Sequence, residues 1–310
     1  MIQAKLSGHY REDAHYPAAI VNVTNRCNLA CKHCFIYRDG NPNESPQSIR
    51  DEMPEDAMLE TLGGLRDRHR IRAMLWMGGE PLLKKRFLAR AIHLFAHNTI
   101  TTNGTVPLID FGPQVHYVVS MDGPEDLNDE LRGSGTFRRV LANLAKLDGD
   151  FSSSVQVQCT VTRLNQHRLG ELAEALQGTA VGWMTFSFYV PRANDDSGNA
   201  WNSNEERAHA VREVLRLKAL HGGFIRNSTR SLELMLPPRC EAITASCPAQ
   251  DHVLPLWLED DHFATPFCCY GNDVDCTRCG AWVVFQLAAR MEGRTSAPDG
   301  RPARAAHPRA

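Results

Sequence analysis

Cysteine is the residue type whose spacing points most directly to chemistry in this chain of 310 residues. Nine of the ten cysteines form two groups: Cys27, Cys31 and Cys34 near one end, and Cys240, Cys247, Cys268, Cys269, Cys276 and Cys279 near the other. The tenth, Cys159, stands alone in an apolar run, where we expect a small buried hydrophobic side chain. Clustered cysteines in a reducing compartment indicate metal or redox chemistry rather than disulfides.

The first group has the spacing C-x3-C-x2-C, which puts three thiols on one loop. Three thiolates can ligate three irons of a [4Fe–4S] cluster. The missing fourth ligand then leaves one iron open to bind another molecule, as catalytic metal sites require. A zinc ion with His33 as the fourth ligand is the alternative, and the spacing alone leaves it open.

The elements that must position these cysteines alternate between strands and helices. Apolar runs predict six strands, at residues 20–23, 73–77, 99–102, 115–121, 155–162 and 184–190, and helical patterns predict helices at 53–69, 82–95, 137–147 and 169–176. This alternation indicates an α/β fold with a parallel sheet, either open and doubly wound or an incomplete barrel. Ligands bind beyond the carboxyl ends of such strands, where the polar motifs of this chain fall.

Several of these motifs carry a family resemblance. Residues 23–35, VTNRCNLACKHCF, resemble the signature loop of the radical SAM superfamily. Residues 77–81, MGGEP, resemble its GGE motif, and Ser120-Met121-Asp122-Gly123, followed by Arg132, resembles the end of its fourth strand. Residues 160–165, TVTRLN, resemble the exit of its fifth strand. The resemblance implies a partial (β/α)6 barrel.

The resemblance also implies a set of cofactors. Cys27, Cys31 and Cys34 would hold a [4Fe–4S] cluster whose open iron binds S-adenosyl-L-methionine (SAM). An electron from a flavodoxin- or ferredoxin-type donor would then split SAM to a 5′-deoxyadenosyl radical, which abstracts hydrogen from a C–H bond. The residues expected to bind SAM are Gly78, Gly79, Glu80, Ser120, Asp122 and Arg132. Among them, Glu80 would pair with an ammonium group and Arg132 with a carboxylate.

The second group surrounds an expected hairpin, with strands at 253–258 and 263–267. A C-x2-C pair plus two thiolates that flank a hairpin make a four-ligand set, which we assign to Cys247, Cys268, Cys276 and Cys279, with Cys269 or Cys240 as substitutes. The pattern resembles the Twitch and SPASM modules that hold auxiliary [4Fe–4S] clusters in some radical SAM enzymes. Four thiolates also suit structural zinc, which is the alternative.

These motifs divide the chain into five parts. We expect an N-terminal extension at 1–19, a radical SAM core at 20–192, a connecting helical segment at 193–236, an auxiliary iron–sulfur module at 237–285 and an unstructured tail at 286–310. The connecting segment contains a capping box at Ser203 and Glu206, which predicts a helix that begins there.

The expected activity is oxidation of a C–H bond in a small metabolite or a peptide, with the auxiliary cluster as electron acceptor. Tyr189, Arg192 and Asp195 follow the last core strand and are candidates to face the substrate. One alternative within enzymes is a redox-neutral lyase or rearrangement, or a peptide-maturing enzyme that forms C–C or C–S bonds. A non-catalytic iron–sulfur or zinc scaffold is the alternative from another class.

Composition limits the partners. The 34 basic and 36 acidic residues nearly cancel, so the chain lacks the strong basic field of nucleic-acid-binding proteins. It contains no stretch of about 18 apolar residues that would predict a membrane span. Residues 1–16 lack the apolar region of a signal peptide. We therefore expect a cytoplasmic protein with neither nucleic acid nor a membrane as its partner.

Overall fold

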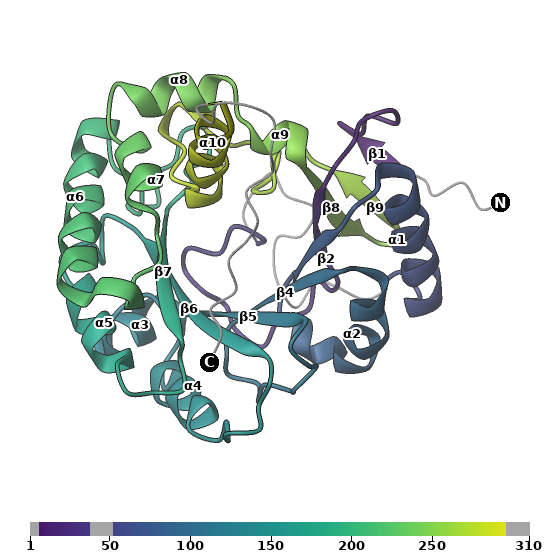
Figure 1. The fold of residues 1–310 in the computed structure, drawn as a ribbon, viewed down its shortest axis with the longest axis horizontal. Helices are drawn as coiled ribbons and strands as arrows, with labels where there is room; N and C mark the ends of the chain where they lie inside the picture. The colour runs from purple at the N-terminus through teal and green to yellow at the C-terminus, as the bar shows by residue number, and fades with distance from the viewer. Residues whose placement is uncertain (1–5, 38–51, 296–310) are drawn as a thin grey trace.

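A nine-stranded sheet organises residues 6–37 and 52–295, which the computed structural model describes. The sheet curves into an open barrel with helices on its outside (Figure 1). Its strands, in spatial order, are β1 (Leu6–Gly8), β9 (His262–Thr265), β8 (Val253–Glu259), β2 (Ala18–Asn22), β3 (Ala73–Met77), β4 (His97–Thr102), β5 (Val115–Ser120), β6 (Ser154–Val161) and β7 (Trp183–Phe188).

The strands from β2 to β7 form the core of the barrel. They are all parallel and follow one another in chain order, with helical segments between most of them. These helices are α1 (Glu55–His69), α2 (Lys85–Ala91), α3 (Glu125–Arg132), α4 (Thr136–Leu144) and α5 (Leu169–Leu176). The predicted partial (β/α)6 barrel is therefore confirmed, with all six strands in place.

Two helical segments differ from expectation. The helix predicted over 82–95 divides into η1 (Pro81–Lys84), α2 and η2 (Ile92–Leu94), and the Glu80 side chain caps the first of these by accepting from the Leu82 N–H. Helix α3 was not predicted at all. Most of its residues are charged or polar, so its apolar pattern is too sparse to reveal it.

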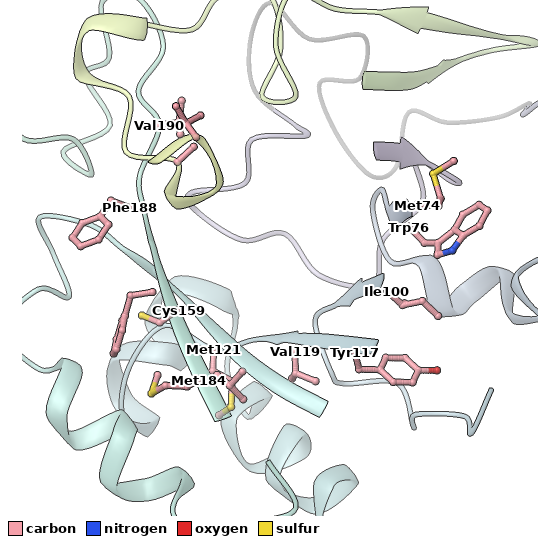
Figure 2. Close-up of a cluster of buried hydrophobic side chains, with 14 of the residues drawn as sticks. Met74, Trp76, Ile100, Tyr117, Val119, Met121, Cys159, Met184, Phe188 and Val190 are labelled. Atoms are coloured by element: carbon pink, nitrogen blue, oxygen red, sulfur yellow. The ribbon is translucent and has the colours of Figure 1, made fainter. Parts of the chain in front are cut away.

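Alternate positions along each strand face opposite sides of the sheet. Apolar side chains such as Trp76 of β3, Ile100 of β4 and Tyr117 of β5 are buried in the hydrophobic core, part of which Figure 2 shows. Cys159 belongs to the same core and is fully buried, which confirms its predicted hydrophobic role. The opposite face of the strands carries polar side chains such as Ser120 and Gln158, which border a cavity described below.

The predicted C-terminal hairpin is present as β8 and β9, which pair antiparallel. Strand β8 also pairs in parallel with β2, with Val253 opposite Ala18, and β1 pairs with β9. The hairpin thus extends the barrel sheet on the side of its first strand.

The remaining helices are α6 (Asn204–His221), η3 (Gly222–Phe224), α7 (Thr229–Leu234), α8 (Arg239–Ala245), α9 (Ala249–His252), η4 (Cys276–Arg278) and α10 (Trp282–Thr295). Among them, η3 and α10 contact β7, whereas α9 contacts β8. Helix α6 begins at Ser203 as predicted, and the Ser203 side chain accepts from the Glu206 N–H. No helix in the described ranges is long and apolar enough to cross a membrane.

Helix α10 corrects the prediction of an unstructured tail from residue 286, because residues 286–295 are helical. Apolar side chains anchor its first turns, since Val284 and Phe285 are buried in the core. The Gln286 side chain accepts a hydrogen bond from Ser228. Residues 296–310 lie outside the described part of the chain.

Candidate active site

Cys27, Cys31 and Cys34 border one cavity of about 170 Å³. The segment that carries them follows β2 and lies within the ring of strands (Figure 1). The strands contribute hydroxyl and amide side chains near their carboxyl ends, from Thr101, Thr102, Ser120, Gln158, Thr160 and Ser187. The cavity thus combines three thiols on one side with neutral polar groups on the other.

The thiols of this loop are partly buried and none is in a disulfide. Burial raises the pKa of Cys27 to about 12 and that of Cys31 to about 11. Thiolates at these positions need a strong positive charge beside them, which a metal centre supplies. The donor set therefore fits a metal cluster.

Asn103, at the turn after β4, also borders this cavity. Its amide group donates to Asn28 Oδ1 at 2.8 Å and lies 3.9 Å from Cys27 Sγ. The predictions from the sequence did not single out Asn103, and its position directly after the strand predicted at 99–102 is the signal that could have found it.

Gly78 and Gly79 border the cavity and hold the start of the cysteine loop. The Gly79 N–H donates to the Thr24 carbonyl and the Glu80 N–H to the Arg26 carbonyl, both at 2.8 Å. A Cβ atom on Gly79 would lie 2.2 Å from the Arg26 carbonyl oxygen, so only glycine permits this approach. The glycine pair thus fixes the loop against the end of β3.

Glu80 lies behind the cavity wall rather than on it. Its fully buried carboxylate accepts from Thr102 Oγ1 at 2.8 Å, the Asn103 N–H at 2.8 Å and the Leu82 N–H at 3.0 Å. Burial raises the pKa of Glu80 above its ordinary value, and these three hydrogen bonds oppose the shift. Direct contact between Glu80 and an ammonium group stays a prediction, because this geometry by itself gives Glu80 a positioning role.

Asp122 is the centre of a second buried network. Its Oδ2 atom lies 2.5 Å from Arg132 Nε and 3.0 Å from His33 Nε2, and its Oδ1 atom accepts from the Thr160 N–H at 2.8 Å. Burial alone would raise the pKa of Asp122, but Arg132 and His33 together hold it below its ordinary value. Asp122 thereby orients Arg132, which borders the cavity as Ser120 does.

His33 is the residue that would be the fourth ligand if the first cysteine group bound zinc. Its Nε2 atom is engaged with Asp122, and its buried Nδ1 atom has no hydrogen-bond partner among the described residues. Within residues 6–37 and 52–295, no three His, Cys, Asp or Glu side chains converge closely enough to hold a metal ion. The three thiols instead share the border of one cavity.

The second cysteine group borders another cavity, of about 250 Å³. The four assigned ligands Cys247, Cys268, Cys276 and Cys279 all border it, and so does Cys269. Burial raises the pKa of Cys279 to about 12 and shifts Cys247 and Cys276 in the same direction. Cys240 does not border this cavity, because it is buried within α8.

Gly280 directly follows Cys279 and contacts the end of β7. The predictions from the sequence did not single it out. The Phe188 N–H at the end of β7 donates to the Gly280 carbonyl at 2.9 Å. A Cβ atom on Gly280 would lie 2.6 Å from the Tyr189 carbonyl oxygen. The residue directly after Cys279 is therefore pressed against the end of the last core strand.

Tyr270 and Val190 border both cavities and form part of the wall between them. The Tyr270 ring packs against Phe35, the neighbour of Cys34, with ring centres 4.8 Å apart. Its phenol hydrogen-bonds to Ser187, which borders the first cavity. Its position after Cys268 and Cys269 is the one feature that marks Tyr270 in the sequence.

The three residues expected to face a substrate do not all border the same cavity in the structure. Tyr189 borders the first cavity, and its hydroxyl donates to Asp195 Oδ2 at 2.9 Å. Arg192 forms an ion pair with Asp196 at 3.4 Å and is not among the residues that border either cavity. Of the three, the geometry brings Tyr189 alone to the cavity wall.

Comparison with known proteins now decides the family. A model of the radical SAM superfamily matches residues 21–187, more than half of the chain. The chain belongs to the radical SAM superfamily. Members of this superfamily use a [4Fe–4S] cluster and SAM, and the loop of Cys27, Cys31 and Cys34 fits the cluster. Superfamily members with Twitch or SPASM modules hold auxiliary [4Fe–4S] clusters, and the thiols of the second cavity fit one.

Curated relatives within the superfamily share the central part of the chain. Pre-heme d1 synthase of Dinoroseobacter shibae is 28% identical over 216 residues, which cover 66% of this chain and 51% of that protein. Mycofactocin maturase MftC of Mycolicibacterium smegmatis is 26% identical over 49% of this chain and 39% of that protein. This radical SAM chain thus spans about half or less of the length of these relatives.

Solved structures share the fold at lower identity. The anSMEcpe enzyme with bound AdoMet (SAM) has a TM-score of 0.62 at 17% identity, and the match covers 89% of this chain and 82% of that one. Streptococcus suis SuiB bound to its precursor peptide SuiA has a TM-score of 0.61 at 13% identity, with 79% of this chain and 58% of that one covered. These likenesses show the fold alone.

Proposed function

We propose that this radical SAM enzyme oxidises a C–H bond of a peptide or a small metabolite, and that a second cluster accepts an electron from the substrate. One observation carries the proposal: two thiol-lined cavities share Tyr270 and Val190 as a common wall. A substrate at this wall would lie close to both centres.

The residues of the first cavity have separate roles in this proposal. Cys27, Cys31 and Cys34 hold the cluster, while Gly78, Gly79, Ser120 and Arg132 bind SAM. When bound, the cluster gives one electron to SAM, and SAM then supplies the radical that takes a hydrogen atom. Asp122 keeps Arg132 in one orientation, which positions it for a carboxylate.

The second cavity would hold the electron acceptor that the oxidation requires. After hydrogen abstraction, the substrate radical must lose one electron and one proton to become the oxidised product. We propose that Cys247, Cys268, Cys276 and Cys279 would hold the centre that accepts the electron, and that the oxidised substrate would then release its proton to solvent. Val190 at the shared wall, and Phe35, which borders the first cavity and packs against Tyr270, would exclude water while the radical exists.

Relatives support two substrate classes. A peptide is supported by the likeness to SuiB, which is bound to a precursor peptide, and to the mycofactocin maturase MftC. A small metabolite is supported by the likeness to pre-heme d1 synthase. A flavodoxin- or ferredoxin-type protein as electron donor belongs to the same proposal. A redox-neutral reaction is the competing function, and it would need no second electron acceptor.

The test compares cysteine variants after anaerobic reconstitution. Wild type should bind about eight irons in two clusters. Changing Cys27, Cys31 and Cys34 to Ala should remove about half of the iron and abolish SAM cleavage. Changing Cys276 and Cys279 to Ala should remove the other half, leave SAM cleavage intact and prevent formation of the oxidised product. Cys240→Ala is the matched control and should retain all of the iron.

Two outcomes would contradict the proposal. A wild-type protein that binds zinc and never cleaves SAM under dithionite is not an enzyme of this kind. A folded Cys276→Ala, Cys279→Ala variant that still yields oxidised product would exclude electron transfer to the second centre. Thermal unfolding would show whether the variant is folded, since metal binding to four thiolates also contributes to folding.

A further inference from the structure

A buried arginine lies next to the second cavity and has no ion-pair partner in the described part of the chain. Arg207 lies in the second turn of α6 and is only 2% exposed. No carboxylate of residues 6–37 or 52–295 approaches its guanidinium within 4.0 Å. A buried cation without a counter-charge costs several kcal/mol, so its presence requires an explanation.

The hydrogen bonds of Arg207 lead directly to the cysteine ligands. Its Nη1 atom donates to the Arg278 carbonyl at 2.8 Å and to the Cys279 carbonyl at 2.6 Å. Asn204, one turn earlier, donates to the Thr277 carbonyl at 3.0 Å. Helix α6 thereby holds the turn η4, which carries Cys276 and leads into Cys279.

These contacts leave the positive charge unbalanced. Arg207 Nε and Nη2 have no hydrogen-bond partner among the described atoms. A neighbouring space of about 10 Å³ has room for about one water, which could accept a hydrogen bond but would not balance a charge. The nearest thiol is that of Cys240, which is buried in α8.

One carboxylate influences Arg207 from a greater distance. Glu241 lies on α8, and its Oε1 atom accepts from Asn204 Nδ2 at 2.7 Å. The residue is partly exposed, but its Oε2 atom is buried and has no hydrogen-bond partner among the described residues. Neither carboxylate oxygen lies within 4.0 Å of the guanidinium, and the attraction between two charges weakens with distance. Glu241 therefore balances the charge of Arg207 only in part.

We propose that the Arg207 guanidinium is the counter-charge of the centre held by Cys247, Cys268, Cys276 and Cys279, and that it makes this centre easier to reduce. Four thiolates give such a centre a net negative charge, and each added electron increases it. A cation that is hydrogen-bonded to the backbone of Cys279 therefore stabilises the reduced form more than the oxidised form. The inference rests on the proposed function, which supplies the second centre.

The experiment measures the reduction potential of the second centre alone. In full-length protein with Cys27, Cys31 and Cys34 changed to Ala, reconstitution should leave only that centre, and a redox titration followed by electron paramagnetic resonance gives its potential. Arg207→Gln keeps a donor but removes the charge, whereas Arg207→Lys keeps the charge. Arg212→Gln, on the exposed side of the same helix, is the control.

We expect Arg207→Gln to lower the equilibrium constant for reduction at least tenfold, which is 59 mV for one electron. Arg207→Lys and Arg212→Gln should remain within about threefold of the parent. Equal shifts in the Gln and Lys variants, or no shift in Arg207→Gln, would overturn the inference while the proposed function stands. A parent protein that binds no iron would overturn both.

If Arg207→Gln fails to retain its iron, Glu241→Gln tests the inference instead. Glu241→Gln removes the carboxylate that partly offsets Arg207, so the centre should become easier to reduce. The potential should then shift in the positive direction, opposite to the shift expected for Arg207→Gln. A potential unchanged in Glu241→Gln would in that case overturn the inference.

Discussion

At the scale of single residues, two buried carboxylates support the first cavity from behind. Glu80 joins the end of β3 to the end of β4 through its bonds to Thr102 and Asn103. Asp122 joins the cysteine loop to α3, because it contacts both His33 and Arg132. Each carboxylate fixes groups on two different elements, so the cavity wall depends on both.

Asp122→Asn should destabilise the protein by about 3–5 kcal/mol at pH 7, because it leaves Arg132 buried without its partner. The pKa of Asp122 is lowered in the folded protein, so its contribution to stability is present above the ordinary pKa of about 4 and is lost as pH falls. Urea unfolding from pH 7 to pH 3 should therefore show the two proteins converging in stability at acid pH.

Asp126→Asn is the control for this experiment. Asp126 is on the same helix as Arg132 and pairs with Arg168, but its side chain is 71% exposed. Its substitution should change the free energy of unfolding by no more than about 1 kcal/mol. A difference between wild type and Asp122→Asn that stays constant across the pH range would show that the carboxylate charge is not what stabilises the fold.

Residues that belong to a recognisable local motif could be predicted from the sequence, and residues that act through contacts between distant segments could not. The cysteines have a recognisable spacing, and the glycines at 78 and 79 stand next to a strand end. Tyr270 and Arg207 have no such pattern. Their importance depends on the approach of segments that are distant in the chain, which residue spacing does not encode.

At the scale of elements, the end of β3 determines where the cysteine loop lies. Gly78 and Gly79 let the backbone of the loop approach until two hydrogen bonds form. The predicted strands matched because each is a short buried apolar run followed by a turn residue. The helix at 82–95 was harder to predict, because Pro81 and the Glu80 cap favour a 3-10 turn at its start.

Gly79→Ala should displace the cysteine loop, because its Cβ atom would overlap the Arg26 carbonyl. The reconstituted variant should lose the iron of the first centre and retain about four irons of the eight. Gly63→Ala is the matched control: its Cβ atom on α1 meets nothing within 4 Å. That variant should keep its iron and gain up to about 1 kcal/mol of stability. Full iron in Gly79→Ala would contradict the anchoring role.

At the scale of the whole molecule, the C-terminal hairpin and the cysteine loop share a small core. Trp257 of β8 is 2% exposed and belongs to one buried cluster with Ile20 of β2, Ile36 of the loop and Met77 of β3. Its ring also lies near Phe35, with centres 6.4 Å apart. The second half of the chain thus supports the cysteine loop through packing.

Trp257→Ala should cost about 3–5 kcal/mol of stability, because it leaves a cavity under the loop. It should also reduce the iron bound by the first centre, although Trp257 is no ligand. Denaturant unfolding and iron analysis would measure both effects. Leu220→Ala, at a position 63% exposed, should change stability by no more than about 0.5 kcal/mol. Unchanged iron in a destabilised Trp257→Ala variant would show that the loop holds its place without the hairpin.

The pairing of β2 with β8 has a consequence for the order of events during synthesis. Strand β2 ends at Asn22, whereas its partner β8 begins at Val253. At translation rates of about 5–20 residues per second, the interval between them is on the order of tens of seconds. During that time the edge of β2 that pairs with β8 is unpaired, and Ile36 is not yet packed against Trp257. We therefore expect the nascent chain to acquire its first cluster only after β8 has left the ribosome, and to need protection from aggregation until then.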